Sequence, residues 1–207
     1  SEMCIRDRFN IAPTQDAPAV INRGHNQLLM MRFGLIPHWS KDDRIGSRLI
    51  NARVETVAKR PAFRACLRDR RCLVPTTGFY EWKPTPQGKA PYFIRLRGER
   101  VFAMAGLYDR WQDPQGAVVH SFTILTTAAN DLMDSIHDRM PVILEMDDEK
   151  EWAVPVPLKE GELERIGTPY PPEKMEMYPV SRAVNNVSKD SEELVRPVAG
   201  ARQRTLL

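Results

Sequence analysis

Long hydrophobic runs and paired cysteines are both missing from this 207-residue sequence. No apolar run approaches the roughly 20 residues that a membrane-spanning helix needs, so we expect a soluble protein. The three cysteines, Cys4, Cys66 and Cys72, are odd in number and lack any C-x-x-C spacing. No basic-then-apolar secretory segment opens the chain. These absences exclude a disulfide framework and favour a reducing, cytoplasmic setting.

A large charge imbalance is also absent, since 30 Lys and Arg residues against 27 Asp and Glu residues leave a formal charge of +3. That value is too small to indicate a nucleic-acid partner by itself. The basic residues are concentrated between positions 44 and 71, where the only acids are Glu55 and Asp69. Such a cluster fits either a polyanionic partner or a solvated helix face.

What the chain does contain predicts one strand-rich domain, because 42% of its residues are hydrophobic and its length suffices for a single core. Apolar segments bounded by turn residues predict strands over residues 27–33, 91–96, 101–107, 121–126 and 142–144, with a hairpin turn at 85–88. Short helices are expected from residue 61 onward and over 128–135 and 147–152. Cys66 and Cys72 then fall in the core. The proline-rich residues 155–172 are expected to be irregular and residues 196–207 to fray.

An acidic side chain among aromatic ones follows the apolar run 72–75. In an extended segment, Tyr80 and Trp82 share one face, while Phe79, Glu81 and Lys83 share the other. A carboxylate in these surroundings is poorly solvated, which suits Glu81 to both giving and taking protons. The alternative is a solvated glutamate on an edge strand.

Three further residues could complete a reactive site with Glu81. His137, held between Ile136 and an acid-base pair, could donate or accept a proton near neutral pH. Asn51 and Arg53 lie two apart, so in a strand they share a face that offers an amide and a guanidinium suited to phosphate. Spacing alone does not show that these residues meet. The four histidines have no ligand-type spacing with the cysteines, so we expect no metal and no cofactor.

Six ordered motifs resemble a known family, the SOS-response-associated peptidase (SRAP) family. They are Asn10-Ile11-Ala12-Pro13-Thr14, Phe33-Gly34-Leu35-Ile36-Pro37, Ile50-Asn51-Ala52-Arg53-Val54-Glu55-Thr56, Gly78-Phe79-Tyr80-Glu81-Trp82, Ile136-His137-Asp138-Arg139-Met140-Pro141 and Val180-Ser181-Arg182-Ala183-Val184-Asn185. The resemblance covers residues 10–197, which we expect to form the SRAP domain. Residues 1–9 are then an atypical N-terminal segment and residues 198–207 a disordered tail.

The resemblance implies an α+β fold in which a mixed sheet closes into a barrel-like core with short helices. It implies a monomer that binds single-stranded DNA with abasic sites, associates with the nucleoid when bound, and traps the lesion as a covalent crosslink. In the family, the α-amine and thiol of an N-terminal cysteine form a thiazolidine with the sugar aldehyde. The matching residues are Cys4 as nucleophile, Asn51 as orienter, Glu81 and His137 as proton-transfer groups, and Arg53, Pro13, Trp39, Arg139 and Arg182 as DNA contacts.

The N-terminal segment departs from the family pattern. The family begins Met-Cys-Gly-Arg and continues through a helical stretch, whereas here only five residues separate Cys4 from Asn10. If synthesis starts at Met3, removal of methionine leaves Cys4 with a free α-amine. If Ser1 is the true start, Cys4 has no α-amine and a thiazolidine is chemically impossible.

Two other functions are compatible with the same residues. The first is a cysteine-type peptidase or autopeptidase, in which residues 1–3 would be a removable leader. The second is a non-covalent single-strand binding module that uses the basic residues and Trp39, which could stack on bases or simply cover the core.

Overall fold

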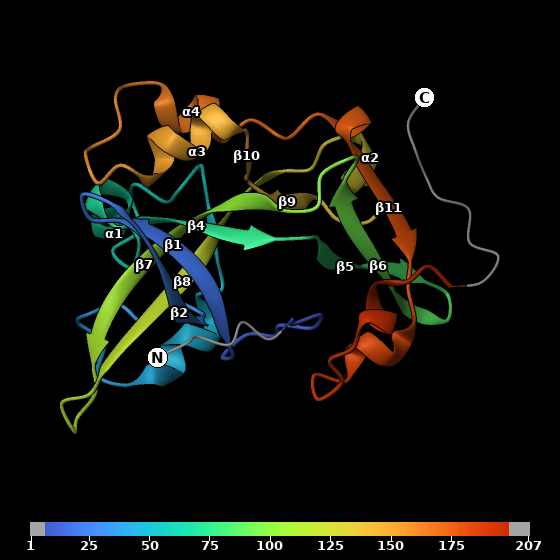
Figure 1. The fold of residues 1–207 in the computed structure, drawn as a ribbon, viewed down its shortest axis with the longest axis horizontal. Coiled ribbons are helices and arrows are strands. Elements are labelled where there is room, and N and C mark those ends of the chain that lie inside the picture. The colour runs from blue at the N-terminus through green and yellow to red at the C-terminus, as the bar shows by residue number, and fades with distance from the viewer. Residues whose placement is uncertain (1–6, 199–207) are drawn as a thin grey trace.

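Five strands close into a barrel in the computed structural model of the chain, which describes residues 7–198 (Figure 1). In order around the ring they are β7 (Phe102–Gln112), β4 (Arg71–Thr76), β1 (Asp16–Asn22), β2 (Asn26–Phe33) and β8 (Val118–Ala128), which pairs again with β7. The β2–β8 pairing is parallel and the other four are antiparallel. The expected barrel is therefore confirmed.

Short strands extend the barrel, and a second sheet lies beside it (Figure 1). The extensions are β3 (Asn51–Arg53), β9 (Arg139–Pro141) and β10 (Ile143–Leu144). The second sheet contains β11 (Met175–Pro179), β6 (Gly88–Leu96) and β5 (Phe79–Thr85) in that order, so β5 is an edge strand. The helices are α1 (Arg64–Asp69), α2 (Asp131–Asp134), α3 (Met146–Ala153) and α4 (Glu162–Ile166), with 3-10 turns η1 (Asp43–Arg48), η2 (Pro172–Lys174), η3 (Arg182–Asn185) and η4 (Glu192–Val195). Across residues 7–198, no helix has the length and apolar character needed to cross a bilayer.

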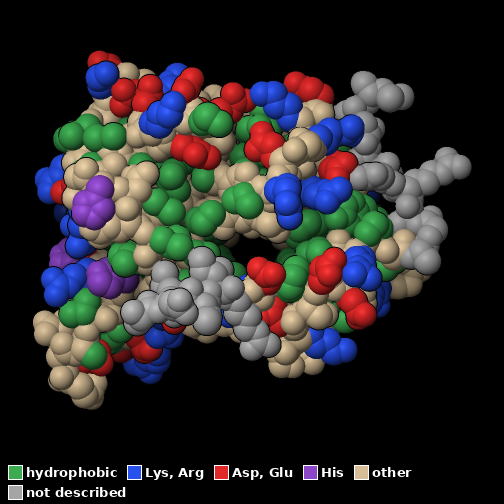
Figure 2. Space-filling model, viewed as in Figure 1, with side chains coloured by type: hydrophobic (Ala, Val, Ile, Leu, Met, Phe, Trp, Pro, Cys, Tyr) green, Lys and Arg blue, Asp and Glu red, His purple; other side chains and the backbone are tan. Residues whose placement is uncertain are grey.

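Three hydrophobic clusters follow from the alternation of side chains along the strands. The first, which we call the inner cluster, fills the barrel and continues onto one face of the second sheet, for example from Ile21 and Phe122 to Ile94 and Met177. The second, which we call the outer cluster, lies outside the barrel under α1, α3 and α4, around the fully buried Trp152. A third covers the other face of the second sheet, around Phe93 and Tyr178. Figure 2 shows the molecule hollowed between the barrel and the second sheet.

The predicted strands, the hairpin turn at 85–88 and the three predicted helices are all present, with shifted ends. The prediction that residues 155–172 are irregular is wrong, because α4 forms among them. Gly161, with φ of +80°, provides the left-handed residue before the helix, and Leu163 and Ile166 pack into the outer cluster. Strand β1 was not predicted, since Pro18 interrupts its sequence and small alanines fill its inward positions.

A hydrogen-bonded ion pair ties β9 to the turn after β3. The two terminal nitrogens of Arg139 donate to the two carboxylate oxygens of Glu55, at 2.6 and 3.0 Å, and one of them also donates to the Thr126 carbonyl at 2.6 Å. Because Thr126 pairs with Arg53 on one side and with Pro141 on the other, Arg139 holds together both strands that flank the end of β8. The hydrogen bonds from Arg139 lower the pKa of Glu55 below its ordinary value.

This ion pair predicts a pH-dependent contribution to stability. A carboxylate with a lowered folded-state pKa stabilises the fold above its unfolded pKa, and that stabilisation is lost as the pH falls through the folded value. Glu55→Gln should therefore lower the free energy of unfolding at pH 7 by about 0.5–1 kcal/mol, as expected for a half-exposed pair. Urea unfolding at pH 7 and pH 3 checks this, and an equal difference at both pH values would contradict it.

A tight turn leads the chain into β1. The Gln15 N–H donates to the Ala12 carbonyl at 3.2 Å, with Pro13 and Thr14 between them, and Thr14 adopts a φ of +74°. This is the geometry of a type II turn, whose third residue is normally glycine because a Cβ is crowded there. Thr14 is the only non-glycine residue with positive φ among residues 7–198.

The strained turn predicts that Thr14→Gly raises the free energy of unfolding. Relief of a left-handed β-branched residue is worth about 1–2 kcal/mol, and the extra freedom of glycine in the unfolded chain offsets about 0.4–1 kcal/mol of it. We expect a net gain of about 0.5 kcal/mol in equilibrium unfolding, taking these two figures together. Thr14→Ala is the control, since it keeps the Cβ and should show no comparable gain. A loss of stability in Thr14→Gly would refute this account.

Candidate functional site

Strand β3 presents Asn51 and Arg53 on one exposed face. The residue between them, Ala52, is fully buried in the outer cluster, so its neighbours point the opposite way. Asn51 lies opposite Ile124 on β8 and Arg53 lies opposite Thr126. The predicted shared face is confirmed, and both side chains lie beside the far end of β8.

Glu81 lies on the face of β5 that is turned toward the inner cluster. Its neighbours Tyr80 and Trp82 pack into the third cluster, whereas Phe79 packs against the inner cluster, as does Tyr92, which lies opposite Glu81 on β6. The predicted alternation along β5 is therefore confirmed. The Glu81 carboxylate accepts the Trp82 backbone N–H at 3.0 Å and is half-buried.

His137 lies in the short connection between α2 and β9. Its Nδ1 accepts the Arg139 backbone N–H at 3.0 Å, which assigns the ring proton of the neutral imidazole to Nε2. The Asp138 carboxylate lies 3.1 Å from the same Nδ1 and can accept its proton when the ring is charged. The side chain is 45% exposed, so the Nε2 side can meet a ligand.

Neighbours of Asn51, Glu81 and His137 share one hydrophobic cluster. Phe79 and Tyr92 beside Glu81, Ile136 beside His137, and Ile124 opposite Asn51 all belong to the inner cluster or pack against it. In addition, β3 and β9 flank the same end of β8 and so lie about 10 Å apart, two strand spacings. Asn51, Arg53 and His137 therefore lie at one end of the barrel, which we call the barrel rim, and Glu81 lies on the second sheet, on the face that the inner cluster joins to the barrel.

A basic pocket adjoins the barrel rim at Arg53. Arg53, Thr56, Lys59, Arg60 and Pro61 line a volume of about 610 Å³. Two consecutive helical turns build it, as the Val57 N–H donates to the Arg53 carbonyl and the Arg60 N–H to the Thr56 carbonyl. The fully buried Val57 anchors these turns, so the basic side chains point outward. The sequence indicated Lys59 and Arg60 only as members of a basic run.

Two other residues of that basic run, Arg70 and Arg71, serve the fold. Arg71 is buried and donates to the carbonyls of Trp152 and Leu67, both at 2.8 Å. Arg70 lies 3.4 Å from the buried carboxylate of Asp109. These two residues are unavailable to an anionic partner, so fewer basic residues can contact one than the composition suggested.

The other predicted DNA contacts lie around the molecule, and their roles stay predictions. Pro13 is exposed in its turn, and Trp39 is 52% exposed. The loop that carries Trp39 is held by Ser121 and Asp109, about 16 Å along β8 from Thr126. Arg139 is committed to Glu55. The Arg182 guanidinium donates to the Gln87 carbonyl at 3.3 Å, which ties η3 to the β5–β6 hairpin.

Two of the three cysteines are unsuited to nucleophilic chemistry. Burial raises the pKa of the Cys66 thiol to about 12 and raises that of the fully buried Cys72 still further. Both are core residues, as predicted. Cys4, the predicted nucleophile, lies outside the described residues. Within residues 7–198, no group of three or more His, Cys, Asp or Glu side chains converges as a metal ion would require.

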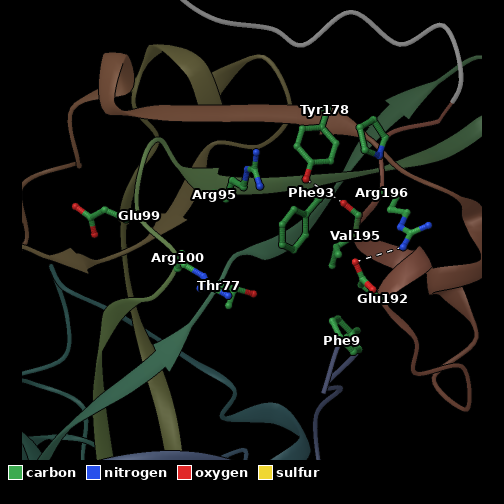
Figure 3. A pocket seen from close by; sticks show the side chains of 11 residues that line it. Phe9, Thr77, Phe93, Arg95, Glu99, Arg100, Tyr178, Glu192, Val195 and Arg196 are labelled. Atoms are coloured by element: carbon green, nitrogen blue, oxygen red, sulfur yellow. Dashed lines mark hydrogen bonds and ion pairs between the residues drawn. The ribbon is translucent and has the colours of Figure 1, made fainter. Parts of the chain in front are cut away.

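A second pocket, of about 640 Å³, lies between the second sheet and the C-terminal segment (Figure 3). Phe93, Arg95 and Tyr178 come from the sheet, Val195 and Arg196 from the C-terminal segment, and Phe9 closes it from the N-terminal side. The Tyr178 hydroxyl donates to the Val195 carbonyl at 2.9 Å. The Tyr80 hydroxyl donates to the Phe9 carbonyl at 2.7 Å, so the N-terminal segment passes next to the strand that carries Glu81.

The chain and its fold both match known proteins. The SOS response associated peptidase (SRAP) family profile matches residues 1–187. The chain is 45% identical over 189 residues to the abasic site processing protein YoqW of Bacillus subtilis, covering 90% of this chain and 84% of YoqW. It is 46% identical over 189 residues to the abasic site processing protein YoaM of the same organism, covering 90% and 83%. A solved structure from Bacteroides thetaiotaomicron superposes with a TM-score of 0.81 at 32% identity, covering 89% of this chain and 82% of that one. The chain therefore belongs to the SRAP family.

Proposed function

We propose that this protein binds single-stranded DNA at abasic sites and captures them covalently through an N-terminal cysteine. The observation that carries the proposal is the match to two proteins named as abasic site processing proteins, at 45% and 46% identity over 90% of this chain. The arrangement of the barrel rim supports it, since His137, Asn51 and a basic pocket lie at one end of the barrel. Action on chromosomal DNA would place the protein, as a monomer, in the cytoplasm.

The chemistry uses the α-amine and thiol of Cys4 in a form of the chain that begins at that residue. The neutral amine adds to the aldehyde carbon of the ring-opened sugar, and loss of water gives an imine. The thiol then adds to the imine carbon and its proton passes to the nitrogen, which closes a thiazolidine. The sum is one C–N bond and one C–S bond formed with the release of one water. An α-amine suits this reaction because its pKa lies well below that of lysine.

The residues of the barrel rim, together with Glu81, would bind the DNA strand and transfer the protons. Arg53 would hold a phosphate next to the lesion and Asn51 would orient the sugar. His137, in the charged form whose Nδ1 proton faces the Asp138 carboxylate, would donate its Nε2 proton to the sugar ring oxygen as the ring opens and would be left as the neutral imidazole. Glu81 would accept the proton that the amine loses on addition and return it to the departing hydroxyl. The sequence-based roles of these residues are thus chemically compatible with their placement.

A second candidate is non-covalent binding of single strands, which the basic pocket favours because it needs no cysteine. Intact mass spectrometry separates the two. The chain starting at Cys4 is incubated with a single-stranded abasic oligonucleotide, and the proposal expects an adduct at the summed mass less one water. Binding without an adduct would leave only the second candidate. The mass of the 207-residue chain beginning at Ser1 also reports on autopeptidase activity, since loss of residues 1–3 would lower it directly.

The proposed proton transfers predict slow crosslinking in two variants. Glu81→Gln and His137→Ala should each lower the single-turnover crosslinking rate by about 100-fold, the usual contribution of a general acid or base. Binding of an intact strand should stay within about twofold, because the lost interaction serves the chemical step. Glu160→Gln, a change at an exposed glutamate before α4, is the control. Unchanged rates in both variants would contradict the assigned roles.

The basic pocket predicts a measurable salt dependence. For single strands, each neutralised phosphate contributes about −0.7 to the slope of log K against log salt. Lys59→Gln and Arg60→Gln should therefore each make the slope shallower by about that amount and weaken binding regardless of base sequence. Lys150→Gln, at an exposed lysine on α3, serves as the control. Slopes equal to that of the unchanged protein would exclude the pocket from the DNA path.

A further inference from the structure

Asp190, in the C-terminal part of the domain, holds residues 8–10 by hydrogen bonds. The Asp190 Oδ1 accepts the Phe9 N–H at 2.6 Å and the Asn10 N–H at 3.2 Å, and its Oδ2 accepts the Arg8 Nε at 2.5 Å. Three donors thus converge on one carboxylate across 180 residues of sequence. Burial favours the neutral form of Asp190, but the bonds from Phe9 and Arg8 outweigh it and lower its pKa, so the group is charged near neutral pH.

The side chain of Asn10 provides a second set of contacts to the C-terminal part of the domain. Its side chain is 6% exposed and its amide nitrogen donates to the carbonyls of Val184, Asn186 and Lys189, at 3.1, 3.3 and 3.1 Å. A buried amide costs free energy unless it is bonded, so these partners fix Asn10 in one position. The turn that presents the carbonyls is itself held by the Asn186 side chain, which accepts the Ser188 N–H.

A further hydrogen bond holds residues 8–10 beside β5, the strand that carries Glu81. The Phe9 carbonyl accepts the Tyr80 hydroxyl, and Tyr80 precedes Glu81 on β5. Phe9 follows Cys4 by five positions, and a chain of five residues reaches at most about 18 Å. We call Arg8, Phe9, Asn10, Tyr80 and Asp190 the N-terminal clamp.

We propose that the N-terminal clamp positions the nucleophile, and that Asp190 is the positioning residue on which it depends. This inference rests on the proposed function. Addition of an amine to an aldehyde is fast only when the two are held in a near-attack geometry, and a displacement of about 1 Å can cost about 100-fold in rate. A tether that is fixed at residues 8–10 restricts the volume that Cys4 can explore. Asp190 itself touches neither the DNA nor the reacting atoms in this account.

The test compares four variants of the chain beginning at Cys4. Asp190→Ala removes all three acceptor contacts, whereas Asp190→Asn keeps an acceptor oxygen for the two backbone N–H groups and loses the charge and the oxygen that accepts Arg8 Nε. Tyr80→Phe removes the hydroxyl that holds the Phe9 carbonyl and serves if Asp190→Ala fails to fold. Glu193→Gln removes an exposed carboxylate from the same C-terminal segment and is the matched control.

Three measurements separate positioning from general stability. The first is the crosslinking rate at saturating abasic DNA. The second is affinity for a strand with a tetrahydrofuran abasic analogue, which has no aldehyde. The third is amide hydrogen exchange at Phe9 and Asn10. Asp190→Ala should lower the rate by about 10- to 100-fold, leave the affinity within about twofold and speed the exchange. Asp190→Asn should recover part of the rate, and Tyr80→Phe should lower it in the same direction.

The outcomes distinguish the two proposals. If the unchanged chain forms no adduct, the proposed function fails, and any role of the clamp in crosslinking fails with it. If the unchanged chain forms the adduct and both Asp190→Ala and Tyr80→Phe react at its rate, only the clamp is overturned. An equal loss of affinity and rate in Asp190→Ala would also overturn it, because that pattern marks a purely structural role.

Discussion

One continuous region of buried apolar surface joins the two sheets that carry Asn51 and Glu81. The inner cluster joins the barrel interior, through Phe122 and Met31, to the inner face of the second sheet, through Ile94 and Met177. A three-stranded sheet is stable only when a hydrophobic face is covered, so the second sheet depends on this contact. Glu81 lies on that sheet and Asn51 lies on a barrel extension. The packing of the two sheets against each other is therefore a consequence of hydrophobic burial and requires no polar contact between these residues.

Polar interactions then fix what burial leaves free. The end of β8 would fray without partners, yet β3 and β9 pair with it on both sides and Arg139 bridges them through Glu55 and the Thr126 carbonyl. The Arg139 N–H also orients His137 by donating to its Nδ1. One residue thus links the backbone around Arg53 to the tautomer of the imidazole. The Arg139 guanidinium is thus engaged by Glu55 and Thr126, and its predicted contact with DNA stays a prediction.

The sequence predicted local features well and missed those decided by distant contacts. Alternation alone placed Asn51 with Arg53, and separated Glu81 from Tyr80 and Trp82, because a strand gives side chains a period of two. Strand β1 was missed because proline and alanine give it low strand propensity, while its pairing between β2 and β4 overrides that preference. Helix α4 likewise depends on packing against the outer cluster. The meeting of Asp190 with Phe9 could not be read locally at all, since 181 positions separate them.

Charge counting was least informative, and the reason bears on how the protein would find its lesion. Arg71 donates hydrogen bonds to backbone carbonyls and Arg70 pairs with a buried carboxylate. Arg53, Lys59 and Arg60 line the basic pocket. Three phosphate contacts give only modest, strongly salt-dependent affinity for single strands. If the lesion is captured by a covalent bond, weak binding is sufficient, because selectivity then lies in the aldehyde that only an abasic sugar can present.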